Sequence, residues 1–191
     1  MALILRARER IAVPWKNGGG LTREVAVHPK GSGFEGFDWR VSIAEVHAAG
    51  AFSCFAGIER HMAVLSGRLA LSIQGRQLSL TPQSAPLSFA GDVPVQAEPQ
   101  GGPVTDLNVM TRRARFTARL TRGTVYEPLR LEPRPWPSIV IALAEMTLLG
   151  EGAPAQLTAL DAVLIAGAGC ELTAAAPRQG APYCLAELVA T

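Results

Sequence analysis

Histidine and cysteine are both scarce in this sequence, with three of each among 191 residues. The cysteines are odd in number and form no C-x-x-C pair, which favours reduced thiols in a cytoplasm over the disulfide framework of a secreted protein. The histidines share no spacing of the kind that places imidazoles around one metal ion. We therefore predict neither disulfides nor a bound metal. These residues are Cys54, Cys170, Cys184, His28, His47 and His61.

Long apolar runs and charge of one sign are also missing. No segment approaches the roughly 18 apolar residues of a membrane span, and the run within Met1–Arg6 is too short for a signal peptide. We expect a cytoplasmic protein with no membrane partner. The net charge of +2 is too small to predict nucleic acid as a partner. Arginines do cluster between positions 112 and 122, but Phe116 alone does not make an aromatic platform among them, so a solvated face is favoured.

The hydrophobic pattern is mostly two-fold, which is typical of β-strands. Apolar residues alternate with polar or small ones in Trp39–Ala44 and again in Leu69–Leu80, where Gln74-Gly75 predicts a tight hairpin turn. Continuous apolar runs at Ile139–Leu143 and Ala162–Ala166 fit buried strands or short helices. Their β-branched content favours strands. Together with 19 glycines and 14 prolines, this pattern predicts an all-β barrel or sandwich.

A change in composition divides the chain. Polar groups and motifs are concentrated in residues 1–113, whereas residues 114–191 are rich in Ala, Leu and Val after a proline-rich connection at Pro133–Pro137. We predict two β units, 1–113 carrying a candidate pocket and 114–191 forming a second, smaller barrel. The second unit has no evident cluster of titratable residues, so we interpret it as a scaffold or as an interface, for instance of a homodimer.

The segment Val13–Glu24 is the densest in possible ligand contacts. Trp15, Lys16 and Asn17 offer an aromatic wall, a charge and hydrogen bonds, and three glycines after them allow a close backbone approach. The same pattern is also typical of a plain hairpin turn. A phosphate-binding P-loop is not supported, because its lysine would follow the last glycine. A ligand loop and a structural turn therefore both remain open.

The segment Phe52–Leu69 has the layout of the first cupin motif, but it contains His61 alone where a metal-binding cupin has two histidines. Neighbouring Arg60 could hold a carboxylate through two parallel hydrogen bonds, or could form a salt bridge with Glu24, Glu45 or Glu59. Alternation along a strand would place Arg60 and His61 on opposite faces.

Farther along, Asp106 and Asn108 lie two residues apart, on one face of a predicted strand. If that face is turned inward, the two side chains would form a polar floor. If it is turned outward, they are surface residues.

Together these motifs resemble the HutD/Ves family, closely over the first 113 residues and in general character beyond. The resemblance implies a cupin-like double β-barrel, or bicupin, without the usual metal ligands and without a cofactor. HutD members are associated with bacterial histidine utilisation and Ves members with cold or stress responses. The matching motifs are Val13–Glu24, Asp38–Ala44, Phe52-Ser53 with Phe55 and Gly57, Glu59-Arg60, Leu65 with Gly67, Phe89 with Gly91-Asp92, and Asp106–Met110.

Our first hypothesis is a binding protein for a small carboxylate such as formylglutamate or urocanate. Residues that stand in the matching motifs would form its pocket: Trp15, Lys16, Asn17, Thr22, Arg60, Asp106 and Asn108. An alternative is a metal-free cupin enzyme, an isomerase or hydrolase, that uses His61, Lys16 or Asp106 as acid or base. A third hypothesis is an oligomerising interaction module with a vestigial pocket.

Overall fold

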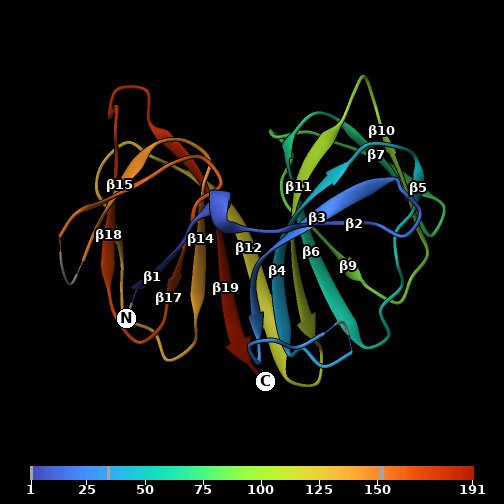
Figure 1. Ribbon diagram of the computed structural model, residues 1–191, viewed down its shortest axis with the longest axis horizontal. Coiled ribbons are helices and arrows are strands. Elements are labelled where there is room, and N and C mark those ends of the chain that lie inside the picture. The colour runs from blue at the N-terminus through green and yellow to red at the C-terminus, as the bar shows by residue number, and fades with distance from the viewer. Residues whose placement is uncertain (1, 34, 151–152) are drawn as a thin grey trace. The chain divides into compact units, whose positions relative to one another are not determined.

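The computed structural model describes residues 2–33, 35–150 and 153–191. These residues form nineteen β-strands and one short 3-10 helix, η1 (Ala7–Glu9), so the all-β prediction is confirmed. No helix in this part of the chain has the length and apolar character needed to span a membrane. The chain divides into two units, Arg10–Ala118 with Thr191 and Arg119–Ala190 with Met1–Glu9, called here the N-terminal and C-terminal units (Figure 1).

The N-terminal unit contains two antiparallel sheets. Sheet order is β2-β3-β4-β11-β6-β9 in the larger one and β5-β10-β7-β8 in the smaller one. The strands are β2 (Ala12–Pro14), β3 (Gly20–His28), β4 (Trp39–Val46), β5 (Gly50–Ala51), β6 (Ile58–Ser66), β7 (Leu69–Ile73), β8 (Arg76–Leu80), β9 (Leu87–Ala90), β10 (Val95–Pro99) and β11 (Val104–Arg112).

The C-terminal unit also has two sheets, ordered β1-β17-β14-β19-β12 and β13-β18-β15-β16. Two opposed sheets per unit are the jelly-roll form of a barrel, in place of one continuously hydrogen-bonded ring. The strands are β1 (Ala2–Leu5), β12 (Phe116–Val125), β13 (Leu129–Leu131), β14 (Ser138–Ala142), β15 (Met146–Leu149), β16 (Ala155–Leu157), β17 (Ala162–Ile165), β18 (Cys170–Ala174) and β19 (Ala181–Ala190).

The first residues of the chain belong to the C-terminal unit because β1 pairs with β17. Asp161 fixes the segment that follows β1, since its carboxylate accepts hydrogen bonds from Arg6 Nη1 at 2.8 Å and from the Ala7 backbone N–H at 2.7 Å. A composition change along the sequence carries no information about this return of the N-terminus, so the predicted ranges 1–113 and 114–191 did not include it.

The predicted strands are present where the alternation placed them. β7 and β8 form the expected hairpin, and both central residues, Gln74 and Gly75, have positive φ. Such a turn matches the right-handed twist of the strands it connects. The apolar runs are the strands β14 and β17, and all five residues of β14 are buried.

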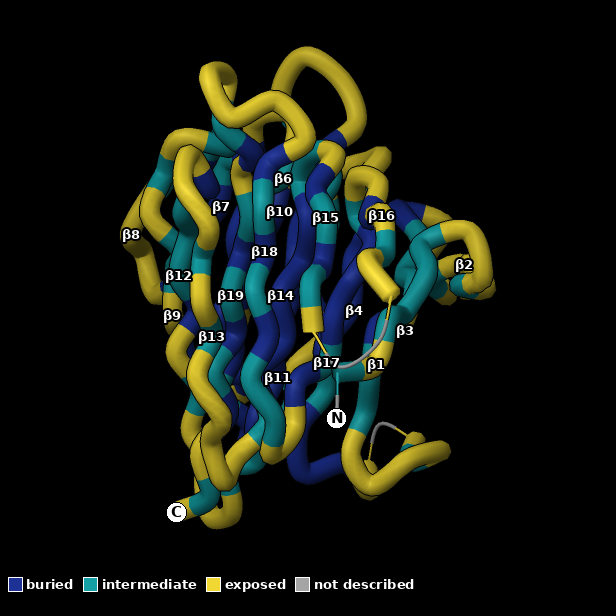
Figure 2. Tube along the Cα trace, turned by 90° about the vertical axis from the view of Figure 1, so that its left-hand side faces the viewer, coloured by how far each residue is buried: buried dark blue, intermediate teal, exposed yellow. Residues whose placement is uncertain are grey.

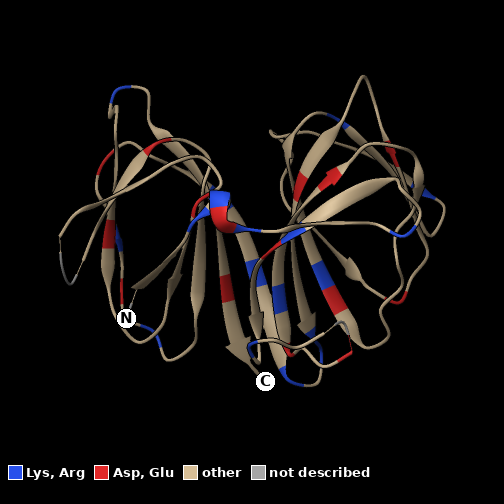
Figure 3. Ribbon diagram, in the orientation of Figure 1, with Lys and Arg blue, Asp and Glu red and all other residues tan. Residues whose placement is uncertain are grey.

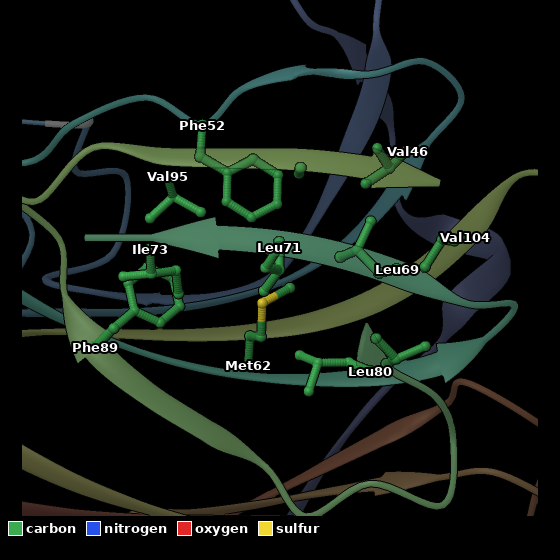
Figure 4. Close-up of a cluster of buried hydrophobic side chains, with 12 residues drawn as sticks. Val46, Phe52, Met62, Leu69, Leu71, Ile73, Leu80, Phe89, Val95 and Val104 are labelled. Atoms are coloured by element: carbon green, nitrogen blue, oxygen red, sulfur yellow. The ribbon is translucent and has the colours of Figure 1, made fainter. Parts of the chain in front are cut away.

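The hydrophobic core of the N-terminal unit lies between its two sheets. Met62 and Val64 from the larger sheet pack with Leu69 and Leu71 from the smaller one, and Figure 4 shows Phe52 and Phe89 in the same cluster. Buried stretches run along the central strands, while loops are mostly exposed (Figure 2). The inward-facing positions of β6 and β11 therefore lie in an apolar interior, and any polar residue there must be accounted for.

Charged residues of both signs are interspersed over the strands and loops (Figure 3). Two arginines of the predicted solvated cluster also hold loops in place. Arg112 donates to the backbone oxygens of Glu35 and Phe37. Arg113 donates to the Ile58 oxygen and pairs with Asp92 at 2.5 Å.

Candidate functional site

The register of β6 and β11 brings three of the predicted site residues together. Arg60 lies opposite Met110, Asn108 opposite Met62 and Asp106 opposite Val64, so all three project from the same face. Arg60 Nη2 donates to Asn108 Oδ1 at 2.7 Å, and Asn108 Nδ2 donates to Asp106 Oδ1. Their exposed fractions are 7%, 6% and 0%. We call Arg60, Asn108 and Asp106 the buried triad. The predicted polar floor faces inward.

Two aromatic rings flank the Arg60 guanidinium. Its Cζ lies 4.9 Å from the centroid of the Phe52 ring and 5.2 Å from that of Phe89. Phe89 stands directly opposite Arg60 in the β6–β9 ladder, whereas Phe52 comes from the segment between β5 and β6. The electron-rich ring faces stabilise the buried cation and leave its edges available for hydrogen bonds.

No acidic side chain in the described part of the chain forms an ion pair with Arg60 within 4.0 Å. The three glutamates considered as partners are paired elsewhere. Glu24 pairs with Arg40 at 2.9 Å, Glu45 with Arg23, and Glu59 with Arg113 at 3.6 Å. The salt-bridge interpretation of Arg60 with these three residues is therefore wrong.

Burial changes the ionisation of both ends of the buried triad. Loss of solvation lowers the pKa of Arg60 to about 10, an effect that the charge of Asp106 opposes. Loss of solvation raises the pKa of Asp106 to about 7, against the opposing influence of Arg60 and of the Asn108 hydrogen bond. Arg60 Nε and Asp106 Oδ2 are both buried without a hydrogen-bond partner. A donor and a carboxyl oxygen are thus left unused in one apolar interior.

The glycine-rich loop connects to the buried triad through aromatic contacts. Trp15 Nε1 donates to Thr22 Oγ1 at 2.8 Å, and the Trp15 ring meets the Phe52 ring edge to face with centroids 6.3 Å apart. Because Phe52 also covers the Arg60 guanidinium, Trp15 and Thr22 support the wall of this interior.

The turn itself explains the other residues of the loop. Asn17 Oδ1 accepts from the Gly19 backbone N–H at 3.0 Å, and Gly18 has a φ of +70°. A Cβ on Gly20 would lie 2.3 Å from the Glu45 backbone oxygen, so that position requires glycine. Lys16 is exposed, and its side chain forms no hydrogen bond or ion pair with the residues that the structure describes. The structural role of the turn is therefore established for Asn17 and the glycines.

His61 lies on the opposite face of β6 from Arg60, as alternation predicts. Its Nδ1 is 2.7 Å from Ser88 Oγ, and its Nε2 is buried without a partner. Burial lowers its pKa, which the charge of Glu59 opposes. Within the described residues, no group of three or more histidine, cysteine, aspartate or glutamate side chains is arranged to hold a metal ion.

The sequence-based hypothesis missed Phe52 and Phe89 as parts of the site. Both stand in motifs of the family resemblance, but their relation to Arg60 depends on a strand pairing and on a loop path that periodicity does not encode. Of the seven predicted residues, Arg60, Asn108 and Asp106 are hydrogen-bonded together, and Trp15 and Thr22 are joined to them through Phe52. Lys16 and Asn17 lie in the turn.

Two hollows lie in the C-terminal unit, with volumes of about 360 and 140 Å³. The smaller one is lined in part by Trp136, Arg134 and Glu187, and these last two form an ion pair at 2.5 Å. The larger one is bordered by Arg130 and Glu171, which pair at 2.9 Å. At the surface of this unit, the fold thus pairs charged residues that are distant in sequence.

The family model described as HutD matches residues 7–183. The chain belongs to the HutD family. It is similar to an uncharacterized 21.2 kDa protein in the hutC 3' region of Pseudomonas putida, at 40% identity over 119 residues that make up 61% of this chain and 62% of that one. It is also 38% identical over 108 residues to protein Ves of Citrobacter koseri, covering 56% of each chain. The chain thus spans about six tenths of the length of the curated relatives it matches.

Solved structures extend the family likeness to the whole fold. HutD from Pseudomonas fluorescens, in a formate condition, is similar with a TM-score of 0.84 and 32% identity over 100% of both chains. A cupin 2 conserved barrel domain protein from Leptotrichia buccalis has a TM-score of 0.61 at 10% identity, covering 94% of this chain and 92% of that one. The HutD/Ves resemblance and the cupin-like fold predicted from the sequence are both confirmed.

Proposed function

We propose that this HutD-family protein is a cytoplasmic binding protein for a small carboxylate metabolite that tunes histidine utilisation or a related amino-acid or stress response. The observation that carries the proposal is Arg60, a guanidinium with 7% exposure, flanked by two phenylalanine rings and without an ion-pair partner among the described residues. A buried arginine of this kind is suited to a carboxylate, which would supply the missing charge and acceptors.

We propose the ligand class from the polarity of the groups around Arg60. Asn108 and Asp106 offer polar contacts, and Phe52 and Phe89 offer apolar surface. Formylglutamate and urocanate combine a carboxylate with a planar polar group and match this set. The names of the Pseudomonas relatives, which place one near hutC and call another HutD, support a role in histidine utilisation.

Binding is tested by calorimetry and thermal unfolding with N-formyl-L-glutamate, urocanate and formate. A ligand at 100 times its Kd stabilises the fold by about 2.7 kcal/mol. For a chain of this size, that raises the Tm by about 5 to 11 °C. Arg60→Ala should abolish the shift. Arg60→Lys keeps a charge beside Asp106 but loses the planar fork, so it should also bind at least tenfold more weakly.

The matched control is Lys16→Ala, which removes an exposed cation from the neighbouring loop. If none of the three carboxylates binds the wild-type protein, the proposal is wrong. If Arg60→Lys binds as tightly as wild type, the carboxylate does not use the Arg60 guanidinium, and the proposed site is wrong.

The second candidate is a metal-free enzyme, an isomerase or hydrolase, in which Asp106 transfers protons. The specific observation in its favour is a buried carboxyl with its pKa near 7, where a general acid or base is most effective. Steady turnover of urocanate or N-formyl-L-glutamate by purified protein, lost in Asp106→Asn, would establish catalysis. Binding without turnover would favour the first candidate.

A further inference from the structure

The hydrogen bonds of the buried triad use both functions of the Asn108 amide. Its oxygen accepts from Arg60 Nη2, and its nitrogen donates to Asp106 Oδ1. Two polar atoms remain without a hydrogen-bond partner. Arg60 Nε is a donor, and Asp106 Oδ2 is an acceptor when ionised and a donor when protonated. Both atoms are almost completely removed from solvent. The amide thus holds an arginine and an aspartate at its two ends, each with one polar atom left over.

The surroundings of Asp106 do not favour its charged form. Val64 and Ala44 flank it across the strand ladders, and both are buried. An ionised carboxylate has about four acceptor sites, and here only one recorded donor, Asn108, reaches them. A proton on Oδ2 would remove the charge and turn an unused acceptor into a donor.

We propose that Asp106 takes up a proton when a carboxylate ligand occupies the site at Arg60, so that the protein binds its ligand together with one proton. This inference rests on the proposed binding function. A carboxylate placed beside the Asn108 amide would accept from Arg60 Nε on one side and from protonated Asp106 Oδ2 on the other. The proton comes from solvent, and an ionised Asp106 would instead repel the ligand.

Among the described residues, few other charged groups lie near Asp106. Arg60 on β6 is the charged group that acts on it directly. On the same sheet, Arg40 of β4 is paired with Glu24 of β3, and the two charges offset each other. Cys54, between β5 and β6, interacts electrostatically with Arg60 and acts to raise the pKa of the guanidinium. From the smaller sheet, the residues that pack into this core are apolar: Leu69, Leu71, Ile73, Leu80, Val95 and Ala97. Cys54 is therefore the group that a control must remove.

The direction of the pH effect follows from the charges. The ligand's negative charge raises the pKa of Asp106 above its ligand-free value of about 7. Above pH 7, the free protein holds an ionised Asp106 and the complex holds a protonated one, so binding weakens as the pH rises, by up to about tenfold per pH unit. Below pH 6, both states are protonated, and the affinity no longer changes.

The test is calorimetry with N-formyl-L-glutamate, whose own groups do not titrate between pH 6 and 8. At pH 8, in buffers of different ionisation enthalpy, the observed heat should report the uptake of close to one proton, and at pH 5.5 close to none. The Kd should be about tenfold higher at pH 8 than at pH 6. In Asp106→Asn, whose amide can donate without a proton, the Kd should be independent of pH. Cys54→Ser should keep the wild-type profile.

Each outcome decides between the two proposals. Binding of N-formyl-L-glutamate without proton uptake at pH 8 would overturn the role of Asp106 and leave the binding function intact. A pH dependence that survives Asp106→Asn, or disappears in Cys54→Ser, would also overturn it. Failure of N-formyl-L-glutamate, urocanate and formate to bind at both pH 6 and pH 8 would overturn the binding of this ligand class and the coupling with it. If Asp106→Asn does not fold, the buffer series on the wild-type protein and on Cys54→Ser decides the question.

Discussion

Asp161 of the C-terminal unit and Asp106 of the N-terminal unit are both buried, with 2% and 0% exposure. Asp161 accepts four hydrogen bonds, from Arg6 Nη1, the Ala7 and Thr158 backbone N–H groups and the Thr158 hydroxyl. Burial acts to raise its pKa, but these bonds outweigh that effect and the pKa is lowered. Asp106 has one donor and an unpartnered oxygen, and its pKa is raised.

The difference separates an aspartate whose hydrogen bonds are all made within the fold from one with hydrogen-bonding capacity left unused. At Asp161, the fold supplies every hydrogen bond that an ionised carboxylate needs. These bonds hold the N-terminal segment at Arg6 and Ala7 in place. At Asp106, the fold leaves hydrogen-bonding capacity unused beside a buried arginine, which lowers stability unless something else binds there. Two such unsatisfied atoms, Arg60 Nε and Asp106 Oδ2, lie in the interior to which we assign the proposed binding site.

The largest expected effect is on the structural side of the comparison. Asp161→Ala removes all four hydrogen bonds and should lower the free energy of unfolding by about 3 kcal/mol. The Tm should fall by roughly 6 to 12 °C. Glu171→Ala, which removes a surface partner of Arg130, is the matched control and should cost less than about 1 kcal/mol. Equal effects of the two substitutions in urea unfolding would contradict the distinction.

The next largest effect is expected in the glycine-rich loop, where Trp15 packs against Phe52. Gly20→Ala would place a Cβ 2.3 Å from the Glu45 backbone oxygen and 3.2 Å from the Trp15 ring, so it should cost about 3 kcal/mol. Gly18→Ala meets no atom within 4 Å but keeps a positive φ, so it should cost only about 1 kcal/mol. A larger loss of stability for Gly18→Ala would show that backbone conformation matters more here than close packing.

A pH series on the ligand-free protein sharpens the contrast between the aspartates. The pKa of Asp106 rises from an ordinary 3.8 to about 7 in the folded state. The folded protein therefore holds more protons than the unfolded chain between these values, and this contribution to stability is lost as the pH rises from about 4 to 7. In Asp106→Asn this loss of stability should be absent. The free energy of unfolding of the variant should therefore increase relative to that of wild type as the pH rises from about 4 to 7. The free energy of unfolding of both proteins is measured by urea unfolding from pH 4.5 to 7.5. If it changes with pH in the same way for both, the pKa of Asp106 is not raised.

The smallest effect is expected at Lys16, which is exposed in the glycine-rich loop. Lys16→Ala should change the free energy of unfolding by no more than about 0.5 kcal/mol. The measurement is again urea unfolding, with Gly18→Ala as the reference for a substitution in the same turn. A loss as large as that of Gly18→Ala would mean that the Lys16 side chain supports the loop.

Much of the fold could be predicted from the sequence because it depends on local pattern. Two-fold alternation identified β4, β7 and β8, and Gln74-Gly75 identified their hairpin turn. The family motifs led to a cupin-like fold without requiring any contact to be known. Arg60, Asp106 and Asn108 were also found, since polar residues at alternate positions of apolar strands stand out in one dimension. The partner of Arg60 could not be chosen in the same way, because Glu24, Glu45 and Glu59 are equivalent candidates until their own arginines are placed.

The sequence by itself determined that the chain is all-β, belongs among HutD and Ves proteins, and carries Arg60 and His61 on opposite faces of one strand. These properties follow from residue order and from the period of a strand. Only the tertiary structure decided that Asn108 joins Arg60 to Asp106, that Phe52 and Phe89 flank the guanidinium, and that the N-terminus returns to Asp161. Such relations depend on which strands pair and in which register, because pairing between distant segments brings side chains together at distances that no local pattern specifies.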